Sequence, residues 1–391
     1  MIYIISDSGG VVDFDLGESA TTLRSRLREL LAELLPPDWS GPFTDDPEVQ
    51  RVVRTVLDRL AEDQLLTIDW PAEYGGAEAS VWESTVLREE MWAYLEPRGP
   101  QYMGLSWVGP TVMEFGTAEQ KRQHLPPIAA GERIWCQGFS EPESGSDLGS
   151  LSLPASADGD GWTVSGQKIW TSYAPIADWC FLAARTSRDE GPKTGGITIF
   201  LVPMDRAGIT VRPIDSMMGE QHLNEVFFDE MRATPADVLG TVGEGWQVIK
   251  FVLNHERIGI PRYARDERLL SELGTLASDA DAPARADYVR ALVRARRARL
   301  LNYRAVALKE SGELSDRAAS GARIASIELD QEVAELAVDM VGASGLRPRS
   351  GGLLGHAEDV YRYARSATIA SGTIEIQRML VARSLMQEVE Q

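Results

Sequence analysis

The sequence predicts an α+β protein with an N-terminal helical domain, a middle β-barrel domain and a C-terminal four-helix bundle. Apolar residues recur at helical spacing in the first and last parts of the chain. Between them, apolar residues alternate or cluster in short stretches that are typical of strands. The chain has 391 residues, more than one hydrophobic core normally serves. We therefore expect domains at residues 1–133, 134–239 and 240–391.

The N-terminal domain is predicted to contain at least three helices. A leucine stripe over residues 23–34 predicts the first, which Pro36 and Pro37 end. Apolar stripes over residues 52–60 and 80–92 predict the next two.

The middle domain is predicted to be a small β-barrel or sandwich. Its strands are expected over the following stretches: 161–166, 179–184, 196–202 and 225–229. The first of these alternates like a half-buried strand and is expected to end in a turn at its Ser-Gly pair. Gly, Pro and Asp residues between the stretches favour short connections.

The last domain is predicted to be a bundle of four long amphipathic helices. Their expected ranges are 246–270, 284–310, 318–341 and 373–389. Pro261 is expected to kink the first of them. Neither a strand–GxGxxG–helix unit nor a P-loop pattern occurs, which argues against a Rossmann or P-loop nucleotide site.

Composition excludes several functional classes. The net charge of -20 argues against nucleic acid as a partner, because that surface would need to be basic. Cys136 and Cys180 have no metal-ligand spacing, so no metal site is expected. No apolar run reaches the roughly 18–20 residues that cross a bilayer, so we expect no membrane association and a cytoplasmic location.

Three motifs occur in a fixed order. Residues 135–147 read Trp-Cys-Gln-Gly-Phe-Ser-Glu-Pro-Glu-Ser-Gly-Ser-Asp, residues 166–172 read Gly-Gln-Lys-Ile-Trp-Thr-Ser, and residues 370–378 read Ala-Ser-Gly-Thr-Ile-Glu-Ile-Gln-Arg. On the predicted α–β–α layout, they resemble the signature segments of the acyl-CoA dehydrogenase family. The resemblance spans roughly residues 14–390 and implies FAD as cofactor and an acyl-CoA as substrate.

The resemblance also implies a set of flavin-contacting residues. These are Gln137, Phe139, Ser140, Ser146, Trp170, Ser172, Thr373 and Glu375. Trp170 can offer the isoalloxazine ring a flat apolar wall, and Ser146 is expected to reach the flavin pyrophosphate or the pantetheine arm of the substrate. Taken alone, Trp170 could be a core residue and the Glu-Pro segment a plain turn.

The catalytic base is expected in an unusual place. In many family members a Glu directly precedes the terminal Gly-Thr, but here that residue is Ser371, which cannot act as a free general base at neutral pH. Glu256, followed by Arg257, matches the helix-borne Glu of isovaleryl-CoA and steroid side-chain dehydrogenases. The resemblance thus implies Glu256 as base, Arg257 beside the CoA nucleotide and the Ser371 backbone N–H beside the thioester carbonyl. Glu256 could instead be a solvated helix residue paired with a nearby Arg, and Arg257 a surface or ion-pair residue.

One family segment is missing. Family members usually carry Arg-x-x-Phe-Gly and a later Gln that reach a neighbour's FAD, whereas residues 276–285 lack them and place Asp279 and Asp281 where they would repel a pyrophosphate. This pattern resembles heteromeric actinobacterial acyl-CoA dehydrogenases and implies a second, related subunit in an α2β2 heterotetramer. Arg285 or Arg290 could instead supply the missing positive charge to the pyrophosphate in a homotetramer.

The expected activity is α,β-dehydrogenation of an acyl-CoA in fatty acid or steroid side-chain metabolism. The resemblance implies an electron-transfer flavoprotein or a similar electron acceptor. Two alternatives stay open: a flavin-dependent hydroxylase or oxidase of the same fold, and a non-catalytic partner subunit.

Overall fold

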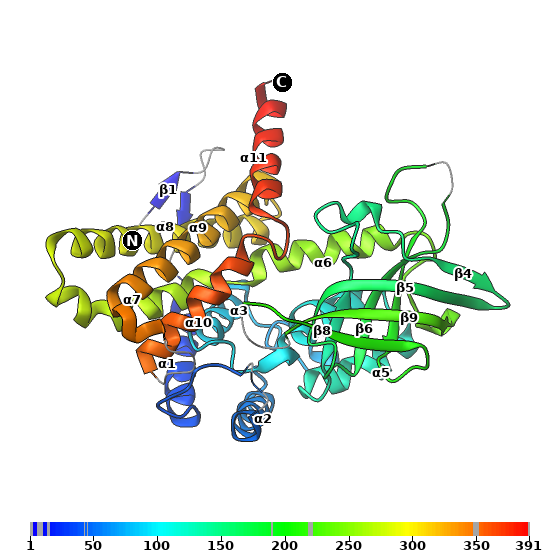
Figure 1. The fold of residues 1–391 in the computed structure, drawn as a ribbon, viewed down its shortest axis with the longest axis horizontal. Coiled ribbons are helices and arrows are strands. Elements are labelled where there is room, and N and C mark those ends of the chain that lie inside the picture. Colours follow the sequence, from blue (N-terminus) through cyan, green and yellow to red (C-terminus); the bar gives the residue numbers. More distant parts are fainter. Residues whose placement is uncertain are drawn as a thin grey trace.

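Helical, β and helical regions follow one another along the chain, which confirms the α+β prediction (Figure 1). The computed structural model describes residues 3–5, 11–13, 16–42, 44, 46–188, 191–217, 222–346 and 352–389. For residues 3–5, 11–13, 254–259, 345–346 and 388–389 it describes the backbone alone.

The N-terminal region is a cluster of helices preceded by a short hairpin. Its elements are β1 (Tyr3–Ile5), β2 (Val11–Asp13), α1 (Gly17–Leu34), α2 (Pro47–Glu62), α3 (Val81–Ala93), α4 (Gly109–Phe115) and α5 (Ala118–Ala129). The three helices predicted from apolar stripes are all present. α3 begins at Ser80 because Ser80 and Glu83 form a reciprocal capping box. A π-helical turn, η3 (Gly104–Val108), precedes α4.

The middle region consists of two four-stranded sheets, in the strand orders β10-β7-β6-β3 and β4-β5-β9-β8. The strands are β3 (Trp135–Gly138), β4 (Ala155–Asp158), β5 (Gly161–Ser172), β6 (Trp179–Arg185), β7 (Ile197–Pro203), β8 (Ile209–Ile214), β9 (Leu223–Ala233) and β10 (Val238–Leu239). Apolar side chains from both sheets share one core, which includes Val164, Phe200 and Phe228. Two sheets around a shared core confirm the predicted small barrel or sandwich.

The predicted end of the first strand was wrong. β5 does not turn at Ser165 and Gly166 but continues to Ser172. Its pairing with β9 shifts register between Val164 and Gly166, and Gly166 has φ 144°. A glycine inside a strand often marks such a bulge, so the turn-like residues here bend the strand without ending it.

The C-terminal region contains six helices within the described ranges. They are α6 (Gly245–Gly259), α7 (Arg262–Asp279), α8 (Ala282–Glu310), α9 (Asp316–Val341), α10 (Gly352–Ala367) and α11 (Ile374–Val389). Figure 1 shows α11 standing out from the rest of the bundle. In the described part of the chain, no helix is both long and apolar enough to cross a membrane.

Two helix predictions needed correction. The stretch 246–270 is broken into α6 and α7 at Ile260 and Pro261, so proline ends one helix where a kink was expected. α10 was not predicted. Its buried side includes Ala357, Ala364 and Ala367, and such small residues make a weak periodic signal.

Candidate functional site

Trp170 lies on the surface at a bulge in β5. The pairing of β5 with β9 shifts register again between Lys168 and Thr171, and Trp170 has φ 61°. This left-handed conformation is unfavourable for a bulky residue and persists only where the surrounding structure imposes it. The side chain is 54% exposed, whereas Lys168 and Thr171 are buried. Trp170 is therefore not a core residue but a flat apolar surface open to a ligand.

The first two motifs are joined by a buried ion pair. Lys168 Nζ lies 2.7 Å from Glu141 Oε1 and donates to the Phe139 carbonyl at 3.0 Å. Glu141 also accepts hydrogen bonds from the backbone N–H groups of Ser152 and Leu153, at 2.6 and 2.8 Å. Both ionic side chains are thus satisfied, as buried charges must be. The pair holds the segment after β3 against β5.

Burial and pairing shift the pKa values of both partners. Burial lowers the pKa of Lys168 to about 8, against the opposing effect of Glu141. Burial favours a higher pKa for Glu141, but Lys168 and the two backbone N–H groups outweigh it and hold this pKa below its ordinary value. At neutral pH the ion pair is therefore charged on both sides.

Polar groups gather beside Trp170. Ile169 N donates to Ser140 O at 2.9 Å, which brings the two motifs into direct contact. Ser140 and Ser172 are half-buried, and neither hydroxyl has a hydrogen-bond partner among the described residues. A flat indole next to hydroxyls with spare hydrogen-bonding capacity suits the ring and polar edge of a flavin.

Phe139 and Ser146 occupy different surroundings. The Phe139 ring is buried and lies 5.8 Å from the Phe181 ring, so this residue can offer a ligand only its backbone. Ser146 is exposed in the turn after the Glu-Pro pair. The adjacent Asp147 forms an ion pair with Lys193, which brings a cation close to Ser146.

The third motif forms a strained turn between α10 and α11. Ser371 has φ 60° and Gly372 has φ 87°. Arg323 from α9 donates to the Ala370 carbonyl at 2.8 Å and holds the start of the turn. The Thr373 hydroxyl accepts from Ile376 N at 3.3 Å, so it caps α11. Ser371 is not a glycine, yet the turn holds it in the left-handed conformation. This constraint fixes the direction of the Ser371 backbone N–H.

Glu375 is exposed in the first turn of α11. Tyr363 of α10 packs against the same core cluster as Phe139 and Tyr173. Tyr173 directly follows β5 and interacts electrostatically with Tyr363, so α10 lies near the end of the strand that carries Trp170. Val252 of α6 provides a second link, because it lines one pocket together with Gln137 of the first motif.

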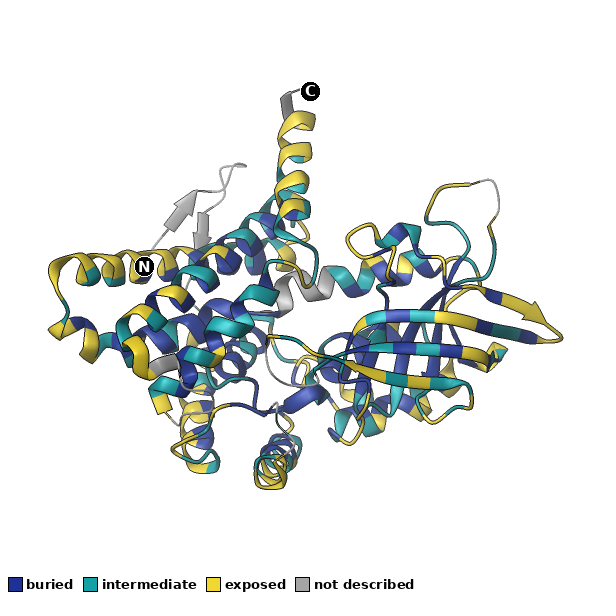
Figure 2. Cartoon of the chain, in the orientation of Figure 1, coloured by how far each residue is buried: buried dark blue, intermediate teal, exposed yellow. Residues whose placement is uncertain are grey.

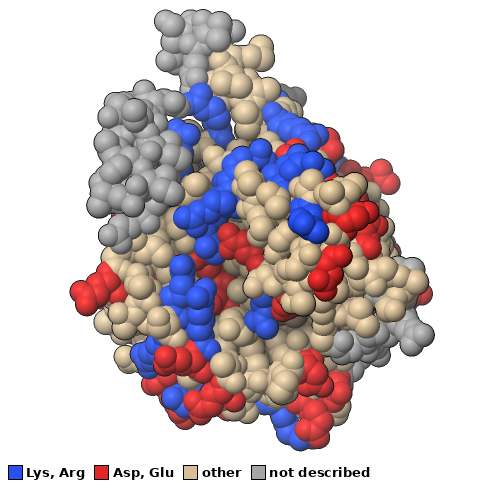
Figure 3. Space-filling view, turned by 90° about the vertical axis from the view of Figure 1, so that its left-hand side faces the viewer, with Lys and Arg blue, Asp and Glu red and all other residues tan. Residues whose placement is uncertain are grey.

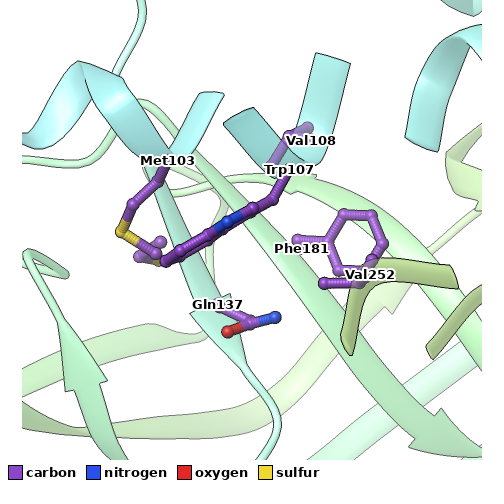
Figure 4. A pocket seen from close by; sticks show the side chains of 7 residues that line it. Met103, Trp107, Val108, Gln137, Phe181 and Val252 are labelled. Atoms are coloured by element: carbon purple, nitrogen blue, oxygen red, sulfur yellow. The ribbon is translucent and has the colours of Figure 1, made fainter. Parts of the chain in front are cut away.

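A mainly apolar pocket lies between η3, β3, β6 and α6 (Figure 4). It is lined by Met103, Trp107, Val108, Cys136, Gln137, Phe181 and Val252. In Figure 4 the Gln137 amide lies below the Trp107 ring, with Phe181 and Val252 to one side. The cavity is small, about 10 Å³, which is room for about one water molecule. π-turns such as η3 often occur at functional sites.

The predicted base belongs to the helix that borders this pocket. Residue 256 follows Val252 by four positions on α6, and residues four apart share one helix face. The side chains of Glu256 and Arg257 lie outside the described residues. Their roles therefore stay predictions.

Residues 276–285 form the end of α7 and the start of α8. Asp281 caps α8 by accepting from Ala284 N at 2.9 Å, which accounts for an acidic residue here without reference to any ligand. Arg285 is exposed and donates to the Ala280 carbonyl at 2.7 Å. The structure thus assigns local structural roles to two residues of the segment that replaces Arg-x-x-Phe-Gly.

The sequence patterns did not predict the pocket or the Lys168–Glu141 pair. A lysine between two apolar stretches of a strand was a usable signal, because buried lysines require a partner. The pocket residues carried no comparable signal, since they come from four separate elements. Cys136 and Cys180 are free thiols opposite each other in β3 and β6. No group of three His, Cys, Asp or Glu able to hold a metal ion occurs within the described residues.

Comparison with known proteins agrees with this arrangement. The chain matches the N-terminal, middle and C-terminal domains of acyl-CoA dehydrogenases over residues 17–132, 136–231 and 243–386. It is 33% identical over 389 residues to acyl-CoA dehydrogenase IpdE1 of Mycolicibacterium smegmatis, covering 93% of this chain and 96% of the relative. It is 31% identical over 382 residues to FadE26 of Mycobacterium tuberculosis, covering 92% and 94%.

Solved structures with this fold include two complexes. The Tcur3481-Tcur3483 steroid ACAD has a TM-score of 0.86 at 32% identity, covering 96% of this chain and 99% of that one. The ChsE4-ChsE5 complex from Mycobacterium tuberculosis has a TM-score of 0.82 at 28% identity, with the same coverage. With all three family domains matched in order and the first two motifs held together around an exposed tryptophan, this chain belongs to the acyl-CoA dehydrogenase family.

Proposed function

We propose that this chain catalyses the FAD-dependent α,β-dehydrogenation of an acyl-CoA thioester, as one subunit of a heteromeric acyl-CoA dehydrogenase. The observation that carries the proposal is the exposed, strained Trp170 beside the unpartnered hydroxyls of Ser140 and Ser172. These groups suit the ring and polar edge of a flavin, which is the group that family membership implies. Electrons would leave to an electron-transfer flavoprotein or a similar acceptor.

The residues of this chain would divide the work between binding and proton transfer. When bound, the flavin supplies the acceptor for the hydride that leaves Cβ. Trp170 would cover one face of its ring, and Gln137, Ser140 and Ser172 would hydrogen-bond along its polar edge. Thr373 and Glu375 would contact it from the start of α11, and Ser146 would reach a phosphate or the pantetheine arm.

Glu256 would remove the Cα proton while the Ser371 backbone N–H polarises the thioester carbonyl. A fixed N–H donor can stabilise the developing negative charge on that oxygen by about 3–4 kcal/mol. The strained turn would hold this N–H in place, and it does not depend on the side chain at position 371. Arg257 would bind the CoA nucleotide. Apolar side chains such as Val252 would help to keep water from the reacting carbons.

The acyl group is proposed to be bulky, such as one derived from a steroid side chain. Support comes from the relative named a steroid ACAD, which shares 32% of residues and the whole fold. A fatty acyl thioester is the alternative, and a series of acyl-CoA substrates of increasing bulk would distinguish the two by kcat/KM.

A second candidate is a non-catalytic subunit that only completes a partner's site. Ser371, in place of the more common Glu, favours this alternative because it leaves the chain without a carboxylate at that position. The two candidates differ in whether substrate reduces the flavin bound beside Trp170 and in whether that reduction needs Glu256.

The test is an anaerobic titration of the purified native assembly with acyl-CoA, followed by flavin absorbance. Bleaching is expected, and Glu256→Gln should keep flavin and ligand binding while slowing bleaching by at least about 10²–10⁴-fold, the usual effect of a general base. Ser371→Ala is the matched control and should change the rate of bleaching little.

A native assembly without FAD would refute the proposal that this chain is an enzyme. Normal bleaching in Glu256→Gln would refute the assignment of Glu256 as the base. Rapid reaction of the reduced flavin with oxygen would indicate an oxidase or hydroxylase.

The heteromer is proposed from the missing Arg-x-x-Phe-Gly segment and from relatives solved as two-component complexes. FAD carries a pyrophosphate, and such an anion is normally met by N–H donors or cations. A related subunit that keeps the Arg-x-x-Phe-Gly segment would supply these donors and cations to the flavin site on this chain. An α2β2 tetramer is the proposed assembly.

A further inference from the structure

The turn between α10 and α11 receives hydrogen bonds on two of its backbone carbonyls. Arg323 Nη2 donates to Ala370 O at 2.8 Å, and Gln377 Nε2 donates to Gly372 O at 3.4 Å. Both side chains come from outside the turn and are buried, with 3% and 1% of their residues exposed. Figure 2 shows that α11 is mostly exposed beyond its first turn. Because much of α11 is open to solvent, the shape of the turn depends on such local contacts.

Arg323 acts on the peptide unit that carries the Ser371 N–H. The Ala370 carbonyl and the Ser371 N–H belong to one planar peptide, which is trans. In a trans peptide the C=O and N–H bonds point in opposite directions, so a donor that fixes the oxygen also fixes where the N–H points. Ser371 has φ 60°, a conformation that a residue other than glycine keeps only where its surroundings impose it. The hydrogen bond from Arg323 is one contact that imposes it.

The charge of Arg323 matters as well as its position. A guanidinium stays protonated in proteins, and a hydrogen bond from a charged donor is about twice as strong as a neutral one. Such a bond polarises the peptide, which makes the N–H at its other end a stronger donor. Figure 3 shows lysine and arginine side chains gathered on the surface at the bundle end, where water and ions screen their charges. Arg323 is buried, so its charge acts on the Ala370 carbonyl with less screening.

We infer that Arg323 is a positioning residue for polarisation of the thioester carbonyl. It acts through the Ala370–Ser371 peptide, where it aims the Ser371 N–H and strengthens it as a donor. Negative charge develops on the thioester oxygen as the Cα proton leaves, and this strengthened N–H stabilises that charge. The inference rests on the proposed function and adds to it a residue that lies outside all three signature motifs.

The test compares Arg323→Gln and Arg323→Lys in the native assembly. Glutamine keeps a neutral hydrogen-bond donor, whereas lysine keeps a cation but loses the planar fork of the guanidinium. The probe is the 3-thia analogue of the acyl-CoA that bleaches the wild-type complex fastest. Sulfur replaces Cβ in this analogue, so no hydride can leave it and the thioester stays intact.

Isotope-edited infrared spectroscopy measures the stretch of the ¹³C-labelled thioester carbonyl of the bound probe. Binding to the wild-type complex should move this stretch to lower wavenumber, because the carbonyl accepts a strong hydrogen bond. Arg323→Gln should show a smaller shift, and Arg323→Lys should lie between the two. If Arg323 only anchored the turn to α9, a folded and flavin-loaded variant would show the same shift as wild type.

The kinetic readout is the rate of anaerobic bleaching at increasing acyl-CoA concentration. The maximum rate should fall at least about tenfold in Arg323→Gln, less than the loss of about 10²–10³-fold that follows removal of a whole oxyanion donor. The half-saturating concentration should change little, because the hydrogen bond matters most once charge has developed on the oxygen.

Arg365→Met is the matched control. Arg365 of α10 also ties its helix to α9, through hydrogen bonds to Gln331 and Glu335 at 2.7 and 3.0 Å. Within the described residues, its side chain makes no hydrogen bond to the 370–373 turn. This variant should therefore keep the carbonyl shift and the bleaching rate of wild type.

Equal carbonyl shifts and equal bleaching rates in Arg323→Gln and wild type would overturn the inference. If Arg323→Gln does not assemble, Arg323→Lys decides alone, and a carbonyl shift equal to that of wild type would overturn it. Lower flavin content with an unchanged shift in the flavin-loaded fraction would leave Arg323 a structural role only. A wild-type complex that no acyl-CoA bleaches would refute the dehydrogenase and the inference with it, whereas an Arg323→Gln complex as active as wild type would refute the positioning role alone.

Discussion

At the residue scale, the contact between Lys168 and Glu141 ties the two β-domain motifs together. Both side chains are buried, and neither could keep its charge alone in this environment. Lys168 comes from β5 and Glu141 from the turn after β3, so the pair fixes where Ser140 lies relative to Trp170. The ion pair therefore contributes to the geometry of the candidate flavin site and also to the stability of the folded protein.

Lys168→Met is expected to destabilise the protein strongly. Methionine fills most of the space but leaves Glu141 buried without its cation, and breaking a buried pair in this way costs about 3–5 kcal/mol. Denaturant unfolding would measure the loss, and flavin content would report the disturbed site. Lys193→Met, which breaks an exposed pair with Asp147, is the control and should leave the free energy of unfolding almost unchanged. Equal effects of the two substitutions would contradict the prediction.

Asp266 is a second buried acidic residue with consequences for stability. Burial raises its pKa well above the ordinary value of 3.8, and the nearby Asp330 raises it further, against the effects of Arg265 and Arg262. The folded protein therefore retains a proton that the unfolded chain releases at lower pH. Since the folded state then binds more protons, its stability falls as the pH rises from the unfolded pKa toward the folded one.

Asp266→Asn is expected to reduce this loss of stability with rising pH. Asparagine has nearly the same shape and carries no charge, so it removes the cost of keeping a carboxyl protonated. The free energy of unfolding should decrease less between about pH 5 and about pH 8 in the variant than in wild type. Urea titrations at both pH values would measure the two slopes. Parallel slopes would show that Asp266 is not protonated in the folded protein.

At the element scale, β5 shows how a strand presents a side chain to a ligand. Its bulge between Lys168 and Thr171 turns Trp170 outward, while Lys168 and Thr171 themselves remain buried. The same strand continues past Gly166, where sequence patterns alone suggest an end. Bulges interrupt the alternation of a strand, so they hide both its length and the direction of its side chains.

Trp170→Ala should therefore affect binding far more than folding. The indole is more than half exposed, so its removal should change the free energy of unfolding by no more than about 1 kcal/mol. Flavin affinity should fall at least about fivefold, as expected for losing a stacked aromatic contact of about 1 kcal/mol. Equilibrium dialysis of the assembled protein with FAD would measure it. Val242→Ala, which also truncates an exposed apolar residue, is the control and should leave flavin binding unchanged.

At the scale of the whole molecule, the predicted site residues lie in the middle and C-terminal regions, and the N-terminal helices add residues of the pocket. Pocket residues come from the N-terminal helices, from the β domain and from α6, and the 371–373 turn lies at the start of α11. The predicted base and the strained turn both belong to the C-terminal region.

The chain expressed alone should bind less than one FAD per molecule, and the assembled complex should bind more per copy of this chain. The reason is the missing cationic segment, which a partner would supply to the pyrophosphate. Light scattering for mass and absorbance for flavin would measure both samples. A stable homotetramer of this chain with one FAD per chain and full activity would contradict the heteromer. The boundaries after residues 133 and 239 likewise remain predictions.

The sequence by itself determined the order of the regions, the positions of most helices and which polar and aromatic residues stand next to one another within each motif. Periodicity reports these features because a helix or strand repeats its buried face at a constant interval. Only the tertiary structure decided that Lys168 reaches Glu141 and that Trp170 is exposed. These features depend on which elements pack together and where a strand bulges. Local patterns do not encode such contacts, because residues distant in sequence create them.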